Sequence, residues 1–213
     1  MFDGGYIQMK LILLPVILLA LTTHEFAHAY VAYLRGDGTA KAMGRMTLNP
    51  WPHIDILGLI CLIFTFFGWA KPVPINPANF KDPKVDEILV SLAGVTANLI
   101  QALFFGLIIR FVDLTVFGSY ASIVHSMLVM SVAINCGLAI FNLIPIPPLD
   151  GSHVLKELLP SSLSIKYVMF FANRTIGFIV LISLLLLLNS GLSVILTIPI
   201  TFLVRIFSGV TLL

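Results

Sequence analysis

Long apolar segments separated by short polar stretches run through the whole chain. Six such segments can be marked, at residues 7–33, 54–69, 85–111, 120–143, 166–188 and 192–207. A helix needs about 20 apolar residues to cross a hydrocarbon core about 30 Å thick, and the second segment is short for that. The pattern predicts an all-α polytopic membrane protein, built as a bundle of about five to six transmembrane helices.

Two polar stretches flank the second apolar segment. Residues 35–55 are rich in glycine and polar residues, with Gly-Asp-Gly and Asn-Pro turn signals and a stretch at 46–48 that fits a short strand. Residues 69–83 are rich in proline, which excludes a helix but permits extended backbone beside protein or a water-filled cavity. We therefore predict a short β or extended re-entrant region between the first two core helices.

Composition supports a membrane protein and excludes other classes. Hydrophobic residues make up 59% of the chain and charged residues 10%, far from the values of a soluble globular domain. The net charge of +2 is small and the basic residues are scattered, so no nucleic-acid partner is expected. Cys61 and Cys136 lie in apolar segments and indicate no disulfide framework. We see no removable signal peptide and no internal repeat, and expect residues 1–213 to form one domain.

The first apolar segment ends in an H-E-x-x-H sequence, formed by His24, Glu25 and His28. Histidines at positions i and i+4 project from one helix face, about 6 Å apart, so both imidazoles can reach one zinc ion. A carboxylate one residue after the first histidine can lie beside the open position of the metal and take a proton from zinc-bound water. The motif therefore indicates a catalytic zinc site with Glu25 as general base.

The alternative is that these are isolated polar side chains satisfied by hydrogen bonds in the core. With five histidines and three glutamates in 213 residues, chance placement gives the motif with a probability of roughly 0.002. Each ionisable group also costs about 2.5 to 3.5 kcal/mol on membrane-insertion scales, and three occur here within one and a half helical turns. Both arguments favour a functional site.

A catalytic zinc ion needs a third protein ligand and keeps its fourth position for water. Asp150 follows the fourth apolar segment within the Pro-Ile-Pro-Pro-Leu-Asp-Gly stretch at 145–151. The prolines force extended backbone and Gly151 permits a sharp turn, which directs Asp150 back at the bundle. The alternative role for Asp150 is the N-cap of a helix at 152–159. Three histidines are rival third ligands: His53, His125 and His153.

These motifs together resemble the site-2 protease family of intramembrane zinc metalloproteases, in its short form without PDZ or CBS domains. The second motif is N-x-x-P-x-P-x-x-D-G at 142–151, residues 94–98 resemble the family's G-x-x-x-N element, and residues 67–77 resemble a segment of its short bacterial and archaeal members. Val95 stands where many members have proline. The resemblance implies one zinc ion per chain, held by His24, His28 and Asp150, with Glu25 as catalytic base.

The resemblance and the chemistry of the substrate imply further site residues. The resemblance implies that Asn142 is a polar group near the metal and that its side chain holds substrate or an oxyanion. A helical substrate hides its backbone carbonyls and must unwind before attack, so the extended stretches 69–83 and 142–151 are the expected clamps. The substrate-binding candidates are Trp69, Pro72, Pro74 and Asn76. The catalytic core is expected at about residues 7–151, with accessory C-terminal helices at about 152–213.

The position of the motifs constrains the topology. H-E-x-x-H lies near the end of the first segment and Asp150 just beyond the end of the fourth, so both ends must face the same side to share a zinc ion. Residues 51–84 must then cross the membrane an even number of times or not at all. Either residues 54–69 dip in and return, or they span and residues 69–83 return in extended form. We prefer the second, because extended backbone could pair with an extended substrate.

The basic residues predict the orientation. On this topology the active-site side carries seven of them and the opposite side carries Lys10 and Arg110, so the positive-inside rule makes the active-site side cytoplasmic. The seven are Arg35, Lys41, Arg45, Lys81, Lys84, Lys156 and Lys166.

The sequence thus predicts a zinc-dependent intramembrane endopeptidase in a bacterial or archaeal cell membrane. Its expected partners are the lipid bilayer and a membrane-spanning protein or peptide substrate. The alternative is a metal or proton transporter, since intramembrane His, Glu and Asp also mark ion routes. The lack of a repeat and the convergence of these residues near one face argue against transport. An intact Glu25 argues against an inactive zinc-binding scaffold.

Overall fold

The computed structural model describes residues 4–65, 68–173, 176–177, 179–180, 183 and 193–211. This described part is helical and contains no β-strand; it has one isolated antiparallel bridge, between Ile54 and Ala70. The expected all-α class is confirmed. Residues 46–48, which fitted a short strand, form bends, so that expectation is wrong.

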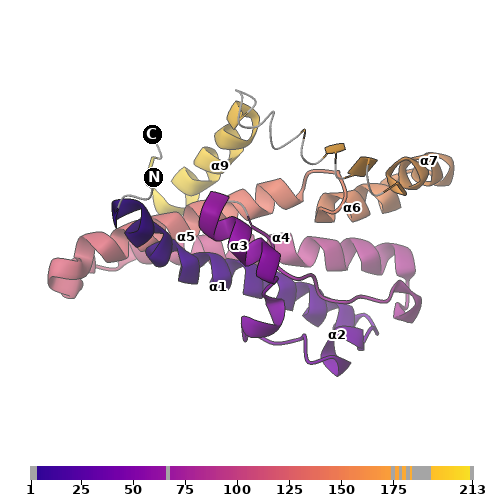
Figure 1. The fold of residues 1–213 in the computed structure, drawn as a ribbon, viewed down its shortest axis with the longest axis horizontal. Helices are drawn as coiled ribbons and strands as arrows, with labels where there is room; N and C mark the ends of the chain where they lie inside the picture. Colours follow the sequence, from indigo (N-terminus) through magenta and orange to yellow (C-terminus); the bar gives the residue numbers. More distant parts are fainter. Residues whose placement is uncertain are drawn as a thin grey trace.

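Three long apolar helices form the body of the molecule. They are α1 (Gly4–Leu34), α4 (Pro83–Phe111) and α5 (Ala121–Asn142), the last preceded by the 3₁₀ turn η3 (Leu114–Tyr120). They pack side by side along the long axis (Figure 1). In the described part of the chain, three stretches are long and apolar enough to cross a membrane: Ile12–Leu34, Pro83–Phe111 and Leu114–Asn142.

The long helices pack through small residues and turn large apolar residues outward. Ala102 of α4 and Val132 and Cys136 of α5 are fully buried against Val204 of α9 (Ser193–Ser208). Large side chains on the outer surface are exposed, such as Phe104 at 58% and Phe111 at 79%. Lipid tails are as apolar as these side chains, so helices in a bilayer associate through small residues that permit close packing. This is the surface of an integral membrane protein.

The segment between α1 and α4 is a short helical hairpin. After α2 (Thr39–Ala42) and η1 (Trp51–His53), helix α3 (Ile56–Thr65) has ten residues. Ten residues rise about 15 Å, half of a hydrocarbon core, so the described residues contain no helix here that is long enough for a full crossing. Residues 66–67 lie outside the described part. The preferred interpretation of 54–69 as a complete span is therefore not supported.

The chain returns beside α3 in extended form, as the prolines predicted. Lys71 N donates to His53 O at 2.8 Å, and η2 (Pro77–Asn79) precedes α4. Two glycines make the close return possible. A Cβ at Gly58 would overlap the carbonyl oxygen of Trp69, and a Cβ at Gly68 would lie 2.5 Å from Gly58 O. Backbone packs on backbone in this hairpin, and a side chain at either glycine would separate the two arms.

The C-terminal part contributes α6 (Asp150–Leu158), α7 (Ser161–Phe171) and α9. Of the predicted fifth segment, 166–188, most residues after 173 lie outside the described part, as does Leu192 of the sixth. Helix α9 packs on α4 and α5, and Arg110 fixes its end by donating to the carbonyls of Ile206 (2.6 Å) and Phe207 (2.9 Å). Within the described residues the count of membrane-long helices is three, against the five to six expected.

Candidate active site

The ends of α1 and α6 bring two histidines and an aspartate together beside α4. The Nε2 atoms of His24 and His28 lie 3.0 Å apart. The Oδ2 atom of Asp150 lies 3.2 Å from Nε2 of His24, and its Oδ1 atom 3.4 Å from Nε2 of His28. Among the residues that the structure describes, these three form the group of side chains that could hold one metal ion. The structure thus places residues from distant parts of the sequence at one point.

Hydrogen bonds on the far side of each ring determine which nitrogen faces this point. Nδ1 of His28 lies 2.7 Å from the carbonyl oxygen of Val90, which can only accept, so Nδ1 carries the proton. Nδ1 of His24 lies 2.7 Å from Oδ1 of Asn98. Both Nε2 atoms are then unprotonated and direct their lone pairs toward the centre of the group.

A short relay of amides fixes the orientation of Asn98. Its Nδ2 donates to Ala20 O at 3.2 Å and to Oδ1 of Asn135 at 2.9 Å, and Asn135 in turn donates to Ser131 O at 2.9 Å. Both asparagines are fully buried. Because the relay ends on backbone carbonyls, Asn98 must present its oxygen to His24. Such partners orient metal-binding histidines.

Asp150 is the first residue of α6 and does not cap it. Leu149 is the N-cap, and no side-chain cap is formed. The N-cap alternative for Asp150 is therefore wrong. A Cβ at Gly151 would overlap the carbonyl oxygen of Leu143, so only glycine allows the tight turn that aims Asp150 at the histidines.

The donor set fits a cation. Two unprotonated imidazole nitrogens and a carboxylate face one another at 3.0 to 3.4 Å. The Oδ2 atom of Asp150 is buried and has no hydrogen-bond partner. Electron pairs that converge without a proton between them repel one another, and a cation at the centre removes this repulsion. Two imidazoles and one carboxylate match the ligand types of a catalytic zinc site.

The rival histidines lie elsewhere. Nε2 of the buried His53 donates to Thr47 O at 2.9 Å. His153 lies at 2.9 Å from the carboxylate of Glu87, which also binds Lys156 at 2.8 Å and so ties α6 to α4. His125 is exposed on α5. None of the three is in the described group around Asp150.

Glu25 contacts the proline-rich segment. Its Oε2 accepts a hydrogen bond from the backbone N–H of Val73 at 2.8 Å. In an extended chain the side chains of 72 and 74 point to the opposite face from Val73. Pro72 is exposed, Pro74 is half-buried and Trp69 is 43% exposed. Asn76 caps η2 by accepting from Ala78 N at 3.1 Å.

Asn142 lies at the end of α5, where its Nδ2 donates to Leu138 O of its own helix at 3.0 Å. This contact does not bring it into the group of His24, His28 and Asp150. Sequence reasoning missed Asn135, Arg45 and Asp37, all of them buried. An asparagine in the apolar segment 120–143 was the signal available for Asn135, because a polar group there needs a partner.

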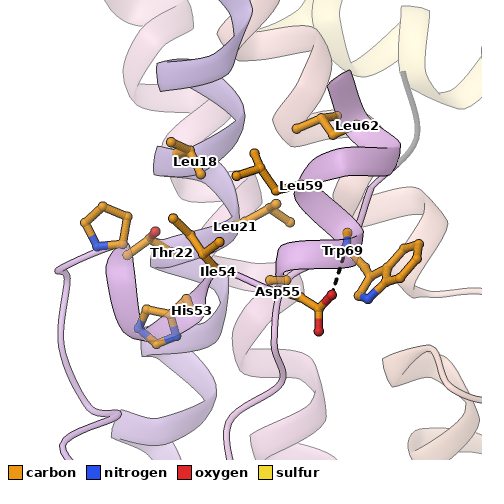
Figure 2. Close-up of a pocket in the computed structure, with 12 residues that line it drawn as sticks. Leu18, Leu21, Thr22, His53, Ile54, Asp55, Leu59, Leu62 and Trp69 are labelled. Carbon is orange, nitrogen blue, oxygen red and sulfur yellow. Dashed lines mark hydrogen bonds between the residues drawn. The ribbon is translucent and has the colours of Figure 1, made fainter. Parts of the chain in front are cut away.

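A small cavity lies beside this region, between α1 and the hairpin (Figure 2). It is lined by Leu18, Leu21 and Thr22 of α1 and by residues of the hairpin that include His53, Leu59 and Trp69. Its volume is about 20 Å³. That is room for about one water molecule, so in this conformation it cannot hold a large substrate side chain.

Gly94 determines how closely the histidines approach α4. A Cβ there would lie 2.5 Å from Cε1 of His24 and 2.5 Å from Nε2 of His28. Gly94→Ala is therefore expected to displace both rings and to lower zinc affinity by at least about tenfold, with activity falling in parallel. Metal titration of the purified protein measures this. Gly137→Ala on α5 is the control, because its nearest neighbour is the flexible end of Ile200 at 3.9 Å, and unchanged zinc binding in both variants would contradict the geometry.

Comparisons with known proteins agree with this site. The model of peptidase family M50 matches residues 108–188. The candidate zinc metalloprotease YwhC of Bacillus subtilis is 38% identical over 183 residues, 83% of this chain and 84% of that protein. The candidate zinc metalloprotease Rip2 of Mycolicibacterium smegmatis is 32% identical over 160 residues, 71% of this chain and 59% of that protein. Rip2 of Mycobacterium tuberculosis is 29% identical over 143 residues, 65% of this chain and 54% of that protein.

The match therefore spans less than two thirds of the Rip2 proteins and most of YwhC. No solved structure matches the chain significantly. A relative 38% identical over most of both sequences is sufficient for an assignment. The chain belongs to peptidase family M50, the site-2 protease family.

Proposed function

We propose that this protein is a zinc-dependent intramembrane endopeptidase, which hydrolyses peptide bonds within or near the membrane-spanning segment of its substrates. The observation that carries the proposal is the convergence of His24, His28 and Asp150, with Glu25 on the same helical turn, inside a bundle of apolar helices. Ionisable residues placed among apolar helices are expensive, and they mark function.

The proposal gives each site residue a role. His24, His28 and Asp150 would hold one zinc ion, which when bound polarises a carbonyl group and makes water more acidic. Asn98 and Val90 keep both imidazoles in the tautomer that offers Nε2. Glu25 takes the proton of the attacking water and delivers it to the leaving amine. His24 and His28 are buried, which limits the contact of bulk water with their rings.

The substrate is a membrane-spanning protein or peptide in the surrounding bilayer. A transmembrane helix must unwind before its carbonyls can be attacked, and the exposed side chains of the extended return offer the unwound segment a surface beside the site. Trp69, Pro72, Pro74 and Asn76 lie on the extended return of the hairpin, and the exposure of Trp69, Pro72 and Asn76 supports a role in substrate contact. We assign Asn142 to the substrate or oxyanion side of the site.

In this proposal, residues 1–213 form a single domain. Its catalytic core covers about residues 7–151, and the helices at 152–213 are accessory. Residues 54–76 form a re-entrant hairpin, so five of the six apolar segments remain to cross the membrane: 7–33, 85–111, 120–143, 166–188 and 192–207. The length of α3, ten residues, supports re-entry over a full span.

Comparison of membrane peptides tests this function. Cells that express the wild-type chain and cells that express Glu25→Gln are compared by mass spectrometry of their membrane fractions. The proposal expects fragments cut within or beside apolar segments in the wild type alone. Identical peptide sets would reject proteolysis.

The active site is proposed to face the cytoplasm, because the basic residues collect on that side. We expect a cysteine at Lys41→Cys, in a Cys61→Ser background, to react with a membrane-impermeant thiol reagent only after the cells are opened. Ser119→Cys, an exposed position before α5, is the matched control and should react in intact cells. Labelling of Lys41→Cys in intact cells would reverse the orientation.

A further inference from the structure

We infer that the peptide unit between Pro72 and Val73 holds the carboxylate of Glu25 in its working position, and that Arg45 holds this peptide unit. Val73 and Arg45 are thus positioning residues for the general base. The inference rests on the proposed function, in which Glu25 is that base.

The contact to Glu25 comes from a single backbone donor. Val73 N lies 2.8 Å from Oε2 of Glu25. The neighbouring residues at 72 and 74 are prolines and carry no N–H, so Val73 is the one donor in this part of the segment. Hydrogen bonds from a backbone N–H to a carboxylate are short and roughly twice as strong as neutral ones. Oε2 is held by this bond, and Oε1 is the oxygen we assign to proton transfer.

Arg45 donates a hydrogen bond to the other end of the same peptide unit. Its Nη2 donates to the carbonyl oxygen of Pro72 at 3.1 Å and to that of Lys71 at 2.6 Å. The Pro72 carbonyl and the Val73 N–H belong to one planar peptide group. The plane therefore lies between a guanidinium and a carboxylate, and each hydrogen bond polarises the group in the sense that strengthens the other.

Arg45 is a buried charge that has no direct ion-pair partner among the described residues. The side chain is 8% exposed, and the described ion pairs do not include it. Its Nε is buried without a partner. A buried charge is costly unless something compensates it. Here the compensating charge is Glu25, which Arg45 reaches through the peptide group.

The rest of the segment is fixed on both sides of Val73. On one side Lys71 N donates to His53 O at 2.8 Å, and on the other Asn76 N donates to the fully buried Asp37 at 2.7 Å. The Val73 side chain packs with Ala29, one helical turn beyond Glu25, and with Ala40. The peptide unit is therefore preorganised, as a base that must act from one position requires.

One pair of variants at Val73 separates the N–H from the side chain. Val73→Pro removes the N–H within an already extended proline-rich run, whereas Val73→Ala removes packing and keeps the N–H. With a peptide substrate identified in the membrane comparison, we expect Val73→Pro to lower kcat by about ten- to a hundredfold with little change in KM. Val73→Ala should retain most of the wild-type kcat, and zinc content should be unchanged in both.

Variants at Arg45 provide a second route that does not alter the segment. Arg45→Met keeps the apolar stem and removes the donors, and Arg45→Lys restores one. We expect kcat to fall in Arg45→Met and to recover in part in Arg45→Lys. Amide hydrogen exchange gives a readout without catalysis, since exchange at Val73 should accelerate by about tenfold in Arg45→Met and in Glu25→Ala.

The outcomes distinguish this inference from the proposed function. An active Glu25→Gln variant would overturn the function itself. If Glu25→Gln is inactive but Val73→Pro and Val73→Ala have the same kcat, the positioning role is overturned alone. A rise in KM without a fall in kcat, or Val73 exchange that is the same in wild type, Arg45→Met and Glu25→Ala, overturns it equally.

Discussion

Glu25→Gln is expected to abolish cleavage and to leave zinc binding and fold unchanged. The amide has almost the same shape as the carboxylate, and its oxygen can still accept the Val73 N–H that binds Oε2 in the wild type. It cannot take a proton from water. Loss of a general base lowers rates by about 10² to 10⁴-fold, which places the variant near background.

The measurement combines a cleavage assay with metal analysis of the same preparation. Glu157→Gln is the matched control, because the carboxylate of Glu157 pairs with Lys156 on α6 and is not part of the group of His24, His28 and Asp150. It should cleave as the wild type does. Cleavage by Glu25→Gln at the rate of the control would remove Glu25 from the chemistry.

Asp150→Asn is expected to lose both zinc and activity. The neutral amide removes the negative charge of the donor set and turns one ligand atom into an N–H donor. Loss of an outer partner of a metal ligand lowers affinity by about 10- to 100-fold, so loss of a ligand itself should exceed about 100-fold.

The same substitution should not destabilise the metal-free protein. The new N–H₂ group can donate to an unprotonated Nε2 of His24 or His28, and the buried oxygen without a partner is no longer charged. Zinc titration and thermal unfolding in the presence of a chelator together measure this pattern of weak metal binding with a stable apo form. Wild-type zinc affinity would exclude Asp150 as a ligand.

The parts of the site that depend on local spacing could be predicted from the sequence. His24 and His28 are four residues apart on a helix, and this spacing alone brings their rings together. Asp150 required a second argument, from its prolines and Gly151 and from family resemblance. The structure places it against both histidines because α6 begins in a turn that only glycine permits.

The parts that depend on tertiary contacts could not be predicted. Arg45 lies in a polar loop, where nothing in the local pattern separates it from Lys41. Its burial appears only when the hairpin returns over Glu25. Asn98 was noticed as part of a motif, but its bond to His24 depends on the packing of α4 against α1.

In the fold, too, features set by local sequence could be predicted and features set by tertiary contacts could not. The apolar runs at 85–111 and 120–143 predicted α4 and α5 closely, because long apolar runs in a membrane protein leave few alternatives to a helix. The run at 54–69 was ambiguous because its length fits neither a span nor a loop. In the structure this run forms a short helix with an extended return, held by close backbone packing at Gly58 and Gly68. Hydropathy carries no information about such backbone contacts.

Zinc-edge X-ray absorption on the purified wild-type chain, with metal analysis, tests the central claim most directly. The account predicts about one zinc ion per chain, as in other catalytic zinc sites, bound by two imidazoles and otherwise by oxygen. A chain purified without chelators that holds no zinc, or a zinc ion bound by sulfur from Cys61 or Cys136, would contradict it.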